Sequence, residues 1–126
     1  MKRLLLAAIV LVLAAGCSHP PVAEAEIALY DGSIETSSSN LIAGEVALEL
    51  ENFGESDHTL VITKDYGEVV FATNAIPPGT TIDVDVDLEA GAYQFTCRIV
   101  AEGEGGVIYD HYQMGMVTDV AVTATG

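Results

Sequence analysis

One stretch of the chain, CRIVAEGEGGVIYDHYQMGM at residues 97–116, concentrates the side chains that bind soft metal ions. It contains one cysteine, one histidine and two methionines: Cys97, His111, Met114 and Met116. A second histidine, His58, follows the turn-like segment NFGESD. Two imidazoles, one thiolate and a weak axial thioether make up the trigonal copper sites that transfer electrons. These residue types therefore indicate a copper site, provided that the fold brings His58 to residues 97–116.

The segments that would position these residues alternate apolar and polar side chains with a period of two. Residues 45–51 and 82–89 each place aliphatic side chains on one face and mainly acidic side chains on the other. This pattern is typical of β-strands with one face in a core and one face in water. In residues 92–98, Cys97 shares a face with Tyr93 and Phe95. We therefore expect the thiol at the inner face, at the end of a strand.

The whole pattern predicts an all-β domain. Turn signals such as KDYGE and NAIPPGT separate the candidate strands. The segment DGSIETSSSN at residues 31–40 is expected to be a loop because it is too polar for a core. Seven to eight short antiparallel strands in about 100 residues predict a Greek-key β-sandwich. The remaining candidate strands are residues 27–30, 58–63, 68–73, 107–110 and 117–123.

The region from residue 27 to residue 123 resembles a cupredoxin, the blue type 1 copper domain. The resemblance is carried by NFGESDHTLVI, IPPGTTIDVDV, GAYQFTC and HYQMGM. It implies one copper ion bound by His58, Cys97 and His111, with Met116 as the axial ligand. Two features depart from the family pattern. Thirteen residues separate the cysteine from the second histidine, where small cupredoxins have two to four, and Thr59 replaces an asparagine that often hydrogen-bonds to the cysteine loop.

Each candidate ligand also has an alternative interpretation. Cys97 could be a small buried apolar side chain, His58 could cap a turn, and His111 could be an exposed loop residue. Met116 could be an ordinary core residue, with Met114 as the axial ligand in its place. Three acidic residues of the long loop are interpreted as solvated charges, with a carboxylate ligand as the alternative: Glu102, Glu104 and Asp110.

The N-terminal residues have the layout of an export signal. Residues 1–16 combine two basic residues, an apolar run and small residues ahead of Cys17. The run of twelve apolar residues is shorter than a membrane-spanning helix requires. LAAGC resembles a bacterial lipoprotein signal, which implies that Cys17 is lipidated. Residues 17–26 would then be a flexible tether, and residues 27–126 the folded domain.

This organisation predicts a location outside the cytoplasm, with the membrane reached through the lipid alone. In a cell with two membranes the protein would lie on the periplasmic side of the outer or inner membrane, and Ser18 after the cysteine resembles an outer-membrane signal. His19 falls in the tether and is not a ligand candidate.

Charge narrows the range of partners. The chain has a formal net charge of −15, and without residues 1–16 only Lys64 and Arg98 remain against nineteen acidic residues, a net charge of −17. This balance argues against nucleic acid and against anionic lipid as partners. It favours a cationic partner, or a saline habitat in which an acidic surface maintains solubility.

These observations favour a monomeric, lipid-anchored cupredoxin that transfers single electrons to or from a cationic redox partner such as a cytochrome or an oxidase. The electron would pass through His111, beside an apolar docking patch formed by Ile108, Tyr109, Tyr112 and Met114. Copper storage or delivery, and a metal-free interaction module, are the alternatives. The sequence contains no recognisable nucleophile–base pair or phosphate-binding motif. We therefore do not expect an enzyme.

Overall fold

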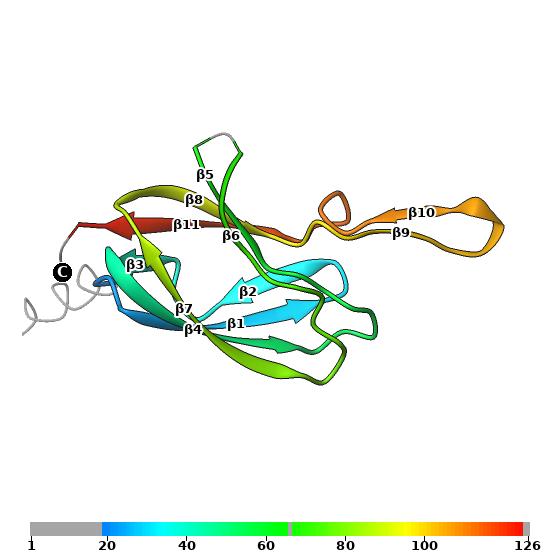
Figure 1. Cartoon of the computed structure of the whole chain (residues 1–126), viewed down its shortest axis with the longest axis horizontal. Helices are drawn as coiled ribbons and strands as arrows, with labels where there is room; N and C mark the ends of the chain where they lie inside the picture. The colour runs from blue at the N-terminus through cyan, green and yellow to red at the C-terminus, as the bar shows by residue number, and fades with distance from the viewer. Residues whose placement is uncertain (1–18, 66, 125–126) are drawn as a thin grey trace, which may run out of the picture.

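The computed structural model describes residues 19–65 and 67–124 (Figure 1). The expected signal at residues 1–16 and the expected lipidation at Cys17 lie outside these residues. The described residues form eleven β-strands and one short 3-10 turn. No helix in this part of the chain is long and apolar enough to cross a membrane. The prediction of an all-β domain is confirmed.

Nine of the strands form two β-sheets that face each other (Figure 1). The first sheet has the order β2-β1-β4-β7. Its strands are β1 (Glu24–Tyr30), β2 (Ser33–Thr36), β4 (Gly44–Asn52) and β7 (Thr81–Leu88). The second sheet has the order β3-β11-β8-β5-β6. Its strands are β3 (Asn40–Ile42), β5 (Val61–Lys64), β6 (Glu68–Ala72), β8 (Gly91–Thr96) and β11 (Val117–Thr123).

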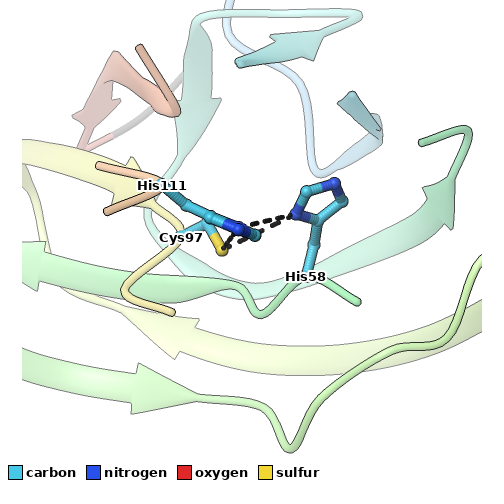
Figure 2. A group of neighbouring side chains, drawn as sticks. All are labelled: His58, Cys97 and His111. Atoms are coloured by element: carbon cyan, nitrogen blue, oxygen red, sulfur yellow. Dashed lines mark hydrogen bonds between the residues drawn. The ribbon is translucent and has the colours of Figure 1, made fainter. Parts of the chain in front are cut away.

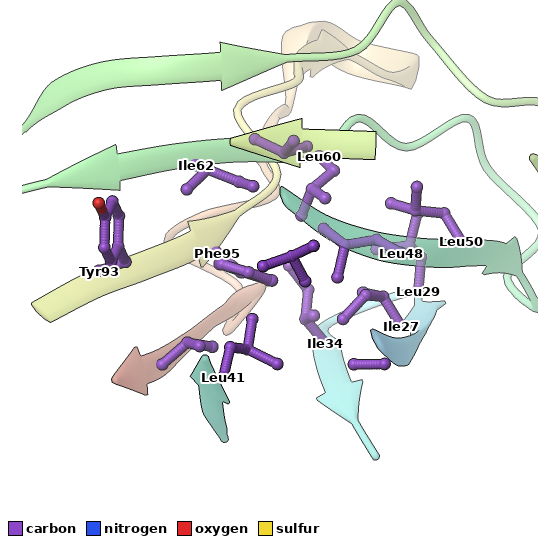
Figure 3. Close-up of a cluster of buried hydrophobic side chains, with 14 of the residues drawn as sticks. Ile27, Leu29, Ile34, Leu41, Leu48, Leu50, Leu60, Ile62, Tyr93 and Phe95 are labelled. Atoms are coloured by element: carbon purple, nitrogen blue, oxygen red, sulfur yellow. The ribbon is translucent and has the colours of Figure 1, made fainter. Parts of the chain in front are cut away.

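The inner faces of the two sheets form one apolar core, drawn in Figure 3. On β4, Leu48 and Leu50 point inward and are buried, while the intervening Glu49 is exposed. On β8, Tyr93 and Phe95 are buried in the same core. The period-two pattern therefore assigned these faces correctly. Burying one apolar row from each sheet is the main stabilising contribution in such a sandwich.

Three details of the fold differ from the sequence-based expectation. β1 begins at Glu24, three residues before the expected start of the domain. Residues 31–40 are not a loop, because they contain β2 and the first residue of β3. Each of these short strands buries one apolar side chain, Ile34 in β2 and Leu41 in β3. One apolar residue among polar ones shows no alternating pattern, so the sequence did not indicate these strands. The sheets are mixed rather than purely antiparallel, since β1–β4 and β3–β11 are parallel pairs.

The two remaining strands, β9 (Val100–Glu102) and β10 (Ile108–Asp110), lie outside the sandwich. They pair only with each other and form a hairpin with the 3-10 turn η1 (Glu104–Gly106) at its tip. Figure 1 shows this hairpin, which we call the arm, extending from one end of the sandwich. The arm lies within the thirteen residues between Cys97 and His111. The long ligand loop is therefore an ordered two-stranded extension.

Candidate metal centre

The turn before His58 is held by a buried asparagine. The Asn52 side chain donates to the carbonyl oxygens of Ser56 and Ile76 and accepts a hydrogen bond from the Gly54 N–H. His58 then forms an isolated β-bridge with Ile76, with N···O distances of 3.1 and 2.7 Å. These bonds fix the backbone of His58 at the end of the sandwich. β5 begins only at Val61, so the expected strand at 58–63 starts three residues late.

Cys97 and Met116 lie opposite each other where two paired strands end. Cys97 follows β8 and Met116 precedes β11, and these strands are antiparallel neighbours. The Cys97 N–H donates to the Met116 carbonyl oxygen at 3.1 Å. Both side chains are buried, with exposed fractions of 0 % and 1 %. The sheet register therefore pairs two buried sulfur-containing residues that are nineteen positions apart in sequence.

His111 is located at the root of the arm. Its N–H donates to the Ile99 carbonyl oxygen at 3.0 Å, and its own carbonyl oxygen accepts from the Met116 N–H at 3.0 Å. The first bond closes the base of the hairpin and the second ties His111 to the start of β11. The side chain is 6 % exposed. The arm therefore does not move His111 away from the site, because the chain leaves the sandwich at Ile99 and returns beside it at His111.

The two histidines and the cysteine form a compact triangle (Figure 2). The Nδ1 atoms of His58 and His111 are 3.2 Å apart, and the Cys97 sulfur lies 3.5 Å from Nδ1 of His111 and 3.9 Å from Nδ1 of His58. The point equidistant from the three atoms lies about 2.1 Å from each, within the range of about 2.0 to 2.3 Å at which nitrogen and sulfur ligands bind a first-row metal ion. The donor set and its geometry therefore fit a type 1 copper ion.

The cysteine sulfur has two hydrogen-bond donors besides the histidines. The Thr59 N–H lies 3.3 Å from the sulfur and the Thr59 hydroxyl 3.6 Å from it. The same hydroxyl oxygen accepts a hydrogen bond from the Arg98 N–H at 3.3 Å. Thr59 thus links the histidine segment to the cysteine loop. In the cupredoxin pattern, an asparagine at this position often makes the hydrogen bond to the cysteine loop.

Burial favours the uncharged form of His111, the second histidine. Removal of the His111 side chain from water lowers its pKa, and the neighbouring His58 lowers that pKa further. A metal ligand must be the neutral imidazole, since the proton and the metal compete for the same nitrogen. The local environment therefore favours the form of His111 that binds metal.

A hollow of about 450 Å³ leads from the surface to the two histidines. One wall is apolar and consists of the arm and the following turn: Ile99, Ala101, Tyr109 and Met114. The lining also includes Asp31, Ser56 and Asp57. The hollow beside the two histidines therefore combines apolar side chains with two acidic ones.

The remaining sequence candidates lie away from the triangle. Met114 is 49 % exposed at the rim of the hollow, whereas Met116 is buried. Glu102 and Glu104 are exposed on the arm. The Asp110 carboxylate accepts a hydrogen bond from the Gln113 N–H within the turn that follows. The ring of Tyr112 is stacked under the Arg98 guanidinium at 4.4 Å, so it does not join the apolar wall.

One residue of the site escaped the sequence analysis. Asp31 accepts a hydrogen bond from Nε2 of His58 at 2.8 Å. It belongs to the segment that was expected to be a loop, twenty-seven positions before the histidine. An Asp–Gly pair between two candidate strands signals a turn but does not indicate which histidine the turn will reach.

Comparison with known proteins supports this picture. The sequence model of the family described as "Cupredoxin-like domain" matches residues 3–108. The match includes His58 and Cys97 and ends before His111 and Met116. No curated protein sequence matches the chain.

Solved structures with the same fold include several copper proteins. Auracyanin from Roseiflexus castenholzii aligns with a TM-score of 0.65 at 18 % identity, covering 81 % of this chain and 98 % of its own. Auracyanin A from Chloroflexus aurantiacus, described as a "blue" copper protein, aligns with a TM-score of 0.57 at 17 % identity. The alignment covers 81 % of this chain and 98 % of auracyanin A. A purple cupredoxin from Nitrosopumilus maritimus aligns with a TM-score of 0.54 at 16 % identity. The alignment covers 79 % of this chain and 99 % of that protein. At these identities the alignments establish the fold alone.

Proposed function

This chain belongs to the cupredoxin-like family, and from that premise we propose that it binds one copper ion and carries single electrons between proteins. The proposed ligands are His58, Cys97 and His111, with Met116 as the axial ligand. When bound, copper supplies a one-electron redox couple. The observation that carries the proposal is the triangle of buried donor atoms, whose centre lies at metal–ligand distance from all three corners.

The protein residues contribute a site that needs little rearrangement. The backbones of His58, Cys97 and His111 are each fixed by hydrogen bonds to a neighbouring segment. The Cys97 sulfur already receives two hydrogen bonds from Thr59. A site held in one geometry for both oxidation states changes little when the electron arrives, which keeps the reorganisation energy small. This favours an electron carrier over a protein that stores or delivers copper, which must release its metal.

We place the electron path and the docking surface at the arm. Both histidines line the hollow, but His111 is 6 % exposed and His58 only 1 %, so the ring of His111 is the more direct route from the site to the surface. Exposed apolar side chains cluster on the arm and the following turn: Val100, Val107, Ile108, Tyr109 and Met114. This set, which we call the docking patch, keeps three of the four residues expected from the sequence and omits Tyr112. Apolar surface gathered in one place is typical of a protein contact.

The partner that fits this patch is cationic. Asp31 and Asp57 border the hollow, and Glu102 and Glu104 are exposed on the arm. Acidic side chains around an apolar patch steer a positively charged partner toward it and accelerate association at low ionic strength. A cytochrome or an oxidase with a basic docking face would meet this requirement.

Copper binding is tested by adding one equivalent of Cu(II) to residues 18–126 and recording the visible and electron spin resonance spectra. We expect an intense thiolate-to-copper band with narrow hyperfine splitting, and its complete loss in Cys97→Ala. A band that persists in Cys97→Ala would contradict the ligand assignment. Stoichiometric binding without fast electron self-exchange would instead indicate copper storage or delivery.

The charge preference is tested with two small redox reagents of opposite sign. We expect tris(phenanthroline)cobalt(III), an apolar cation, to oxidise the reduced protein faster than ferricyanide relative to their driving forces. The advantage should shrink as salt is added, because ions screen the attraction. Equal salt dependence for both reagents would argue against an acidic docking site.

We also propose that the protein acts outside the cytoplasm on a lipid anchor at Cys17. The signal-like composition of residues 1–16 supports this location. Within the described chain, Val22 pairs with Leu41 of β3, and β3 lies at the end of the sandwich away from the arm (Figure 1). A tether at that end would leave the metal centre facing away from the membrane. Metabolic labelling with a fatty acid, lost in Cys17→Ala, tests the anchor.

A further inference from the structure

The metal ligand His58 has a carboxylate on its outer side. Nδ1 of this ring points into the metal triangle, and Nε2 lies 2.8 Å from Oδ1 of Asp31. The histidine is 1 % exposed and the aspartate side chain 38 % exposed. The ring therefore spans from the solvent-accessible carboxylate to the buried site.

The hydrogen bond determines which nitrogen carries the proton. Backbone N–H groups of Glu55 and Ser56 also donate to the Asp31 carboxylate, at 2.9 and 3.3 Å. A carboxyl group is ordinarily an anion at neutral pH, and these backbone donors favour that form. An ionised carboxylate can only accept hydrogen bonds. Nε2 of His58 must therefore carry a proton, and in the neutral ring this leaves the lone pair of Nδ1 free for a metal.

The turn at Gly54 is shaped around this pair. A Cβ added at Gly54 would lie 2.7 Å from Nε2 of His58 and closer still to Oδ1 of Asp31. Only a residue without a side chain lets the turn pass over the hydrogen bond. The same turn supplies the N–H groups that hold the carboxylate. The turn, the aspartate and the histidine thus form one interlocked unit.

We propose that Asp31 is a positioning residue that fixes the Nε2–H tautomer of His58 and biases the centre toward Cu(II) over Cu(I). The inference rests on the proposed copper function. A carboxylate that accepts a hydrogen bond from a metal-bound imidazole makes the imidazole a stronger donor. A stronger donor and a nearby negative charge both favour the more highly charged ion. The hydrogen bond transmits the effect through the ring, whereas a solvent-exposed charge alone is screened.

The experiment compares Asp31→Asn with Asp57→Asn in the purified chain. Both variants remove one negative charge from the wall of the hollow, but only Asp31 contacts the His58 ring. We expect Asp31→Asn to lose about tenfold in Cu(II) affinity relative to Cu(I) affinity, which raises the reduction potential by about 59 mV for a one-electron couple. Asp57→Asn should shift the potential by less than half as much.

A second readout needs no copper. In the metal-free wild type, the ring nitrogens of His58 should show the Nε2–H tautomer by ¹⁵N NMR, and Asp31→Ala should lose that preference. Equal potential shifts in Asp31→Asn and Asp57→Asn, or an unchanged tautomer in Asp31→Ala, would overturn the inference. A wild type that shows the tautomer but binds no copper would overturn the proposed function and the copper bias while leaving the tautomer assignment standing.

Discussion

The sandwich and the arm both contribute to one metal centre, but they are built on opposite principles. The sandwich buries an apolar row from each of two sheets, and His58 is attached to it through Ile76 and Asp31. The arm pairs two three-residue strands whose side chains are almost all exposed. The sandwich therefore provides stability and fixed ligand geometry, whereas the arm provides surface. Four predictions test this division.

The largest expected effect is on the free energy of unfolding, which should respond strongly to a core substitution and little to one on the arm. Phe95→Ala should lower the free energy of unfolding by about 3–5 kcal/mol, because it leaves a cavity in the core. Ile108→Ala on the arm should change it by no more than about 0.5 kcal/mol. Denaturant unfolding of the metal-free protein measures both. A loss above about 2 kcal/mol for Ile108→Ala would mean that the arm packs on the sandwich.

Shortening the arm should affect electron transfer but not copper binding. Residues 102–108 can be replaced by Asn-Gly, which closes a two-residue hairpin between the paired Ala101 and Tyr109. The root with its Ile99–His111 hydrogen bond remains. We expect the copper band to be kept and the rate with the cationic cobalt reagent to fall several-fold. Loss of the copper band would show that the arm positions His111.

The hydroxyl of Thr59 should have a smaller effect, of opposite sign to that of Asp31. Thr59→Val removes one hydrogen-bond donor from the Cys97 sulfur and leaves the backbone N–H in place. The sulfur becomes a stronger donor, which stabilises Cu(II), so the potential should fall, by less than the roughly 59 mV of a tenfold affinity change. Voltammetry beside Thr59→Ser, which retains the hydroxyl, provides the control. A rise in potential would contradict this account.

The smallest expected effect is on the pH dependence of the free energy of unfolding. The pKa of His111 is lowered in the folded metal-free protein, while the unfolded chain keeps the ordinary value of about 6.5. The unfolded state therefore binds more protons below that pH, and the stability contributed by neutral His111 is lost as the pH falls toward the lowered pKa. We expect the unfolding free energy of wild type, measured relative to His111→Gln, to decrease from pH 7 to pH 5. The comparison cancels the titration of the many carboxylates, and a flat difference would contradict the prediction.

Strong alternation made parts of the fold predictable. Residues 45–51 and 82–89 carry long apolar rows with acidic residues between them, and both are strands. The short strands β2 and β3 bury only Ile34 and Leu41, so no local period identifies them. Their pairing with β1 and β11 is decided by neighbours distant in sequence. The same holds for β9 of the arm, which was not among the candidate strands, whereas β10 falls within the expected strand at residues 107–110.

The ligand types could be read from the sequence because cysteine, histidine and methionine are scarce in this chain, so their gathering was itself a signal. The residues that support them gave no such signal. Asp31 is one of nineteen acidic residues, and nothing local distinguishes it from a solvated charge. Tyr112 was expected in the docking patch, but its ring faces Arg98 instead.

The sequence alone thus determined the β-sandwich class, the inner faces of the long strands and the identities of the candidate ligands, since these depend on residue type and on short-range periodicity. Only the tertiary structure decided that His58 and His111, fifty-three positions apart, meet with their Nδ1 atoms 3.2 Å from each other. It also decided that Asp31 lies behind one of them and an ordered arm beside the other. Such meetings depend on sheet register and on turns that close over long stretches of chain, and no local pattern encodes them.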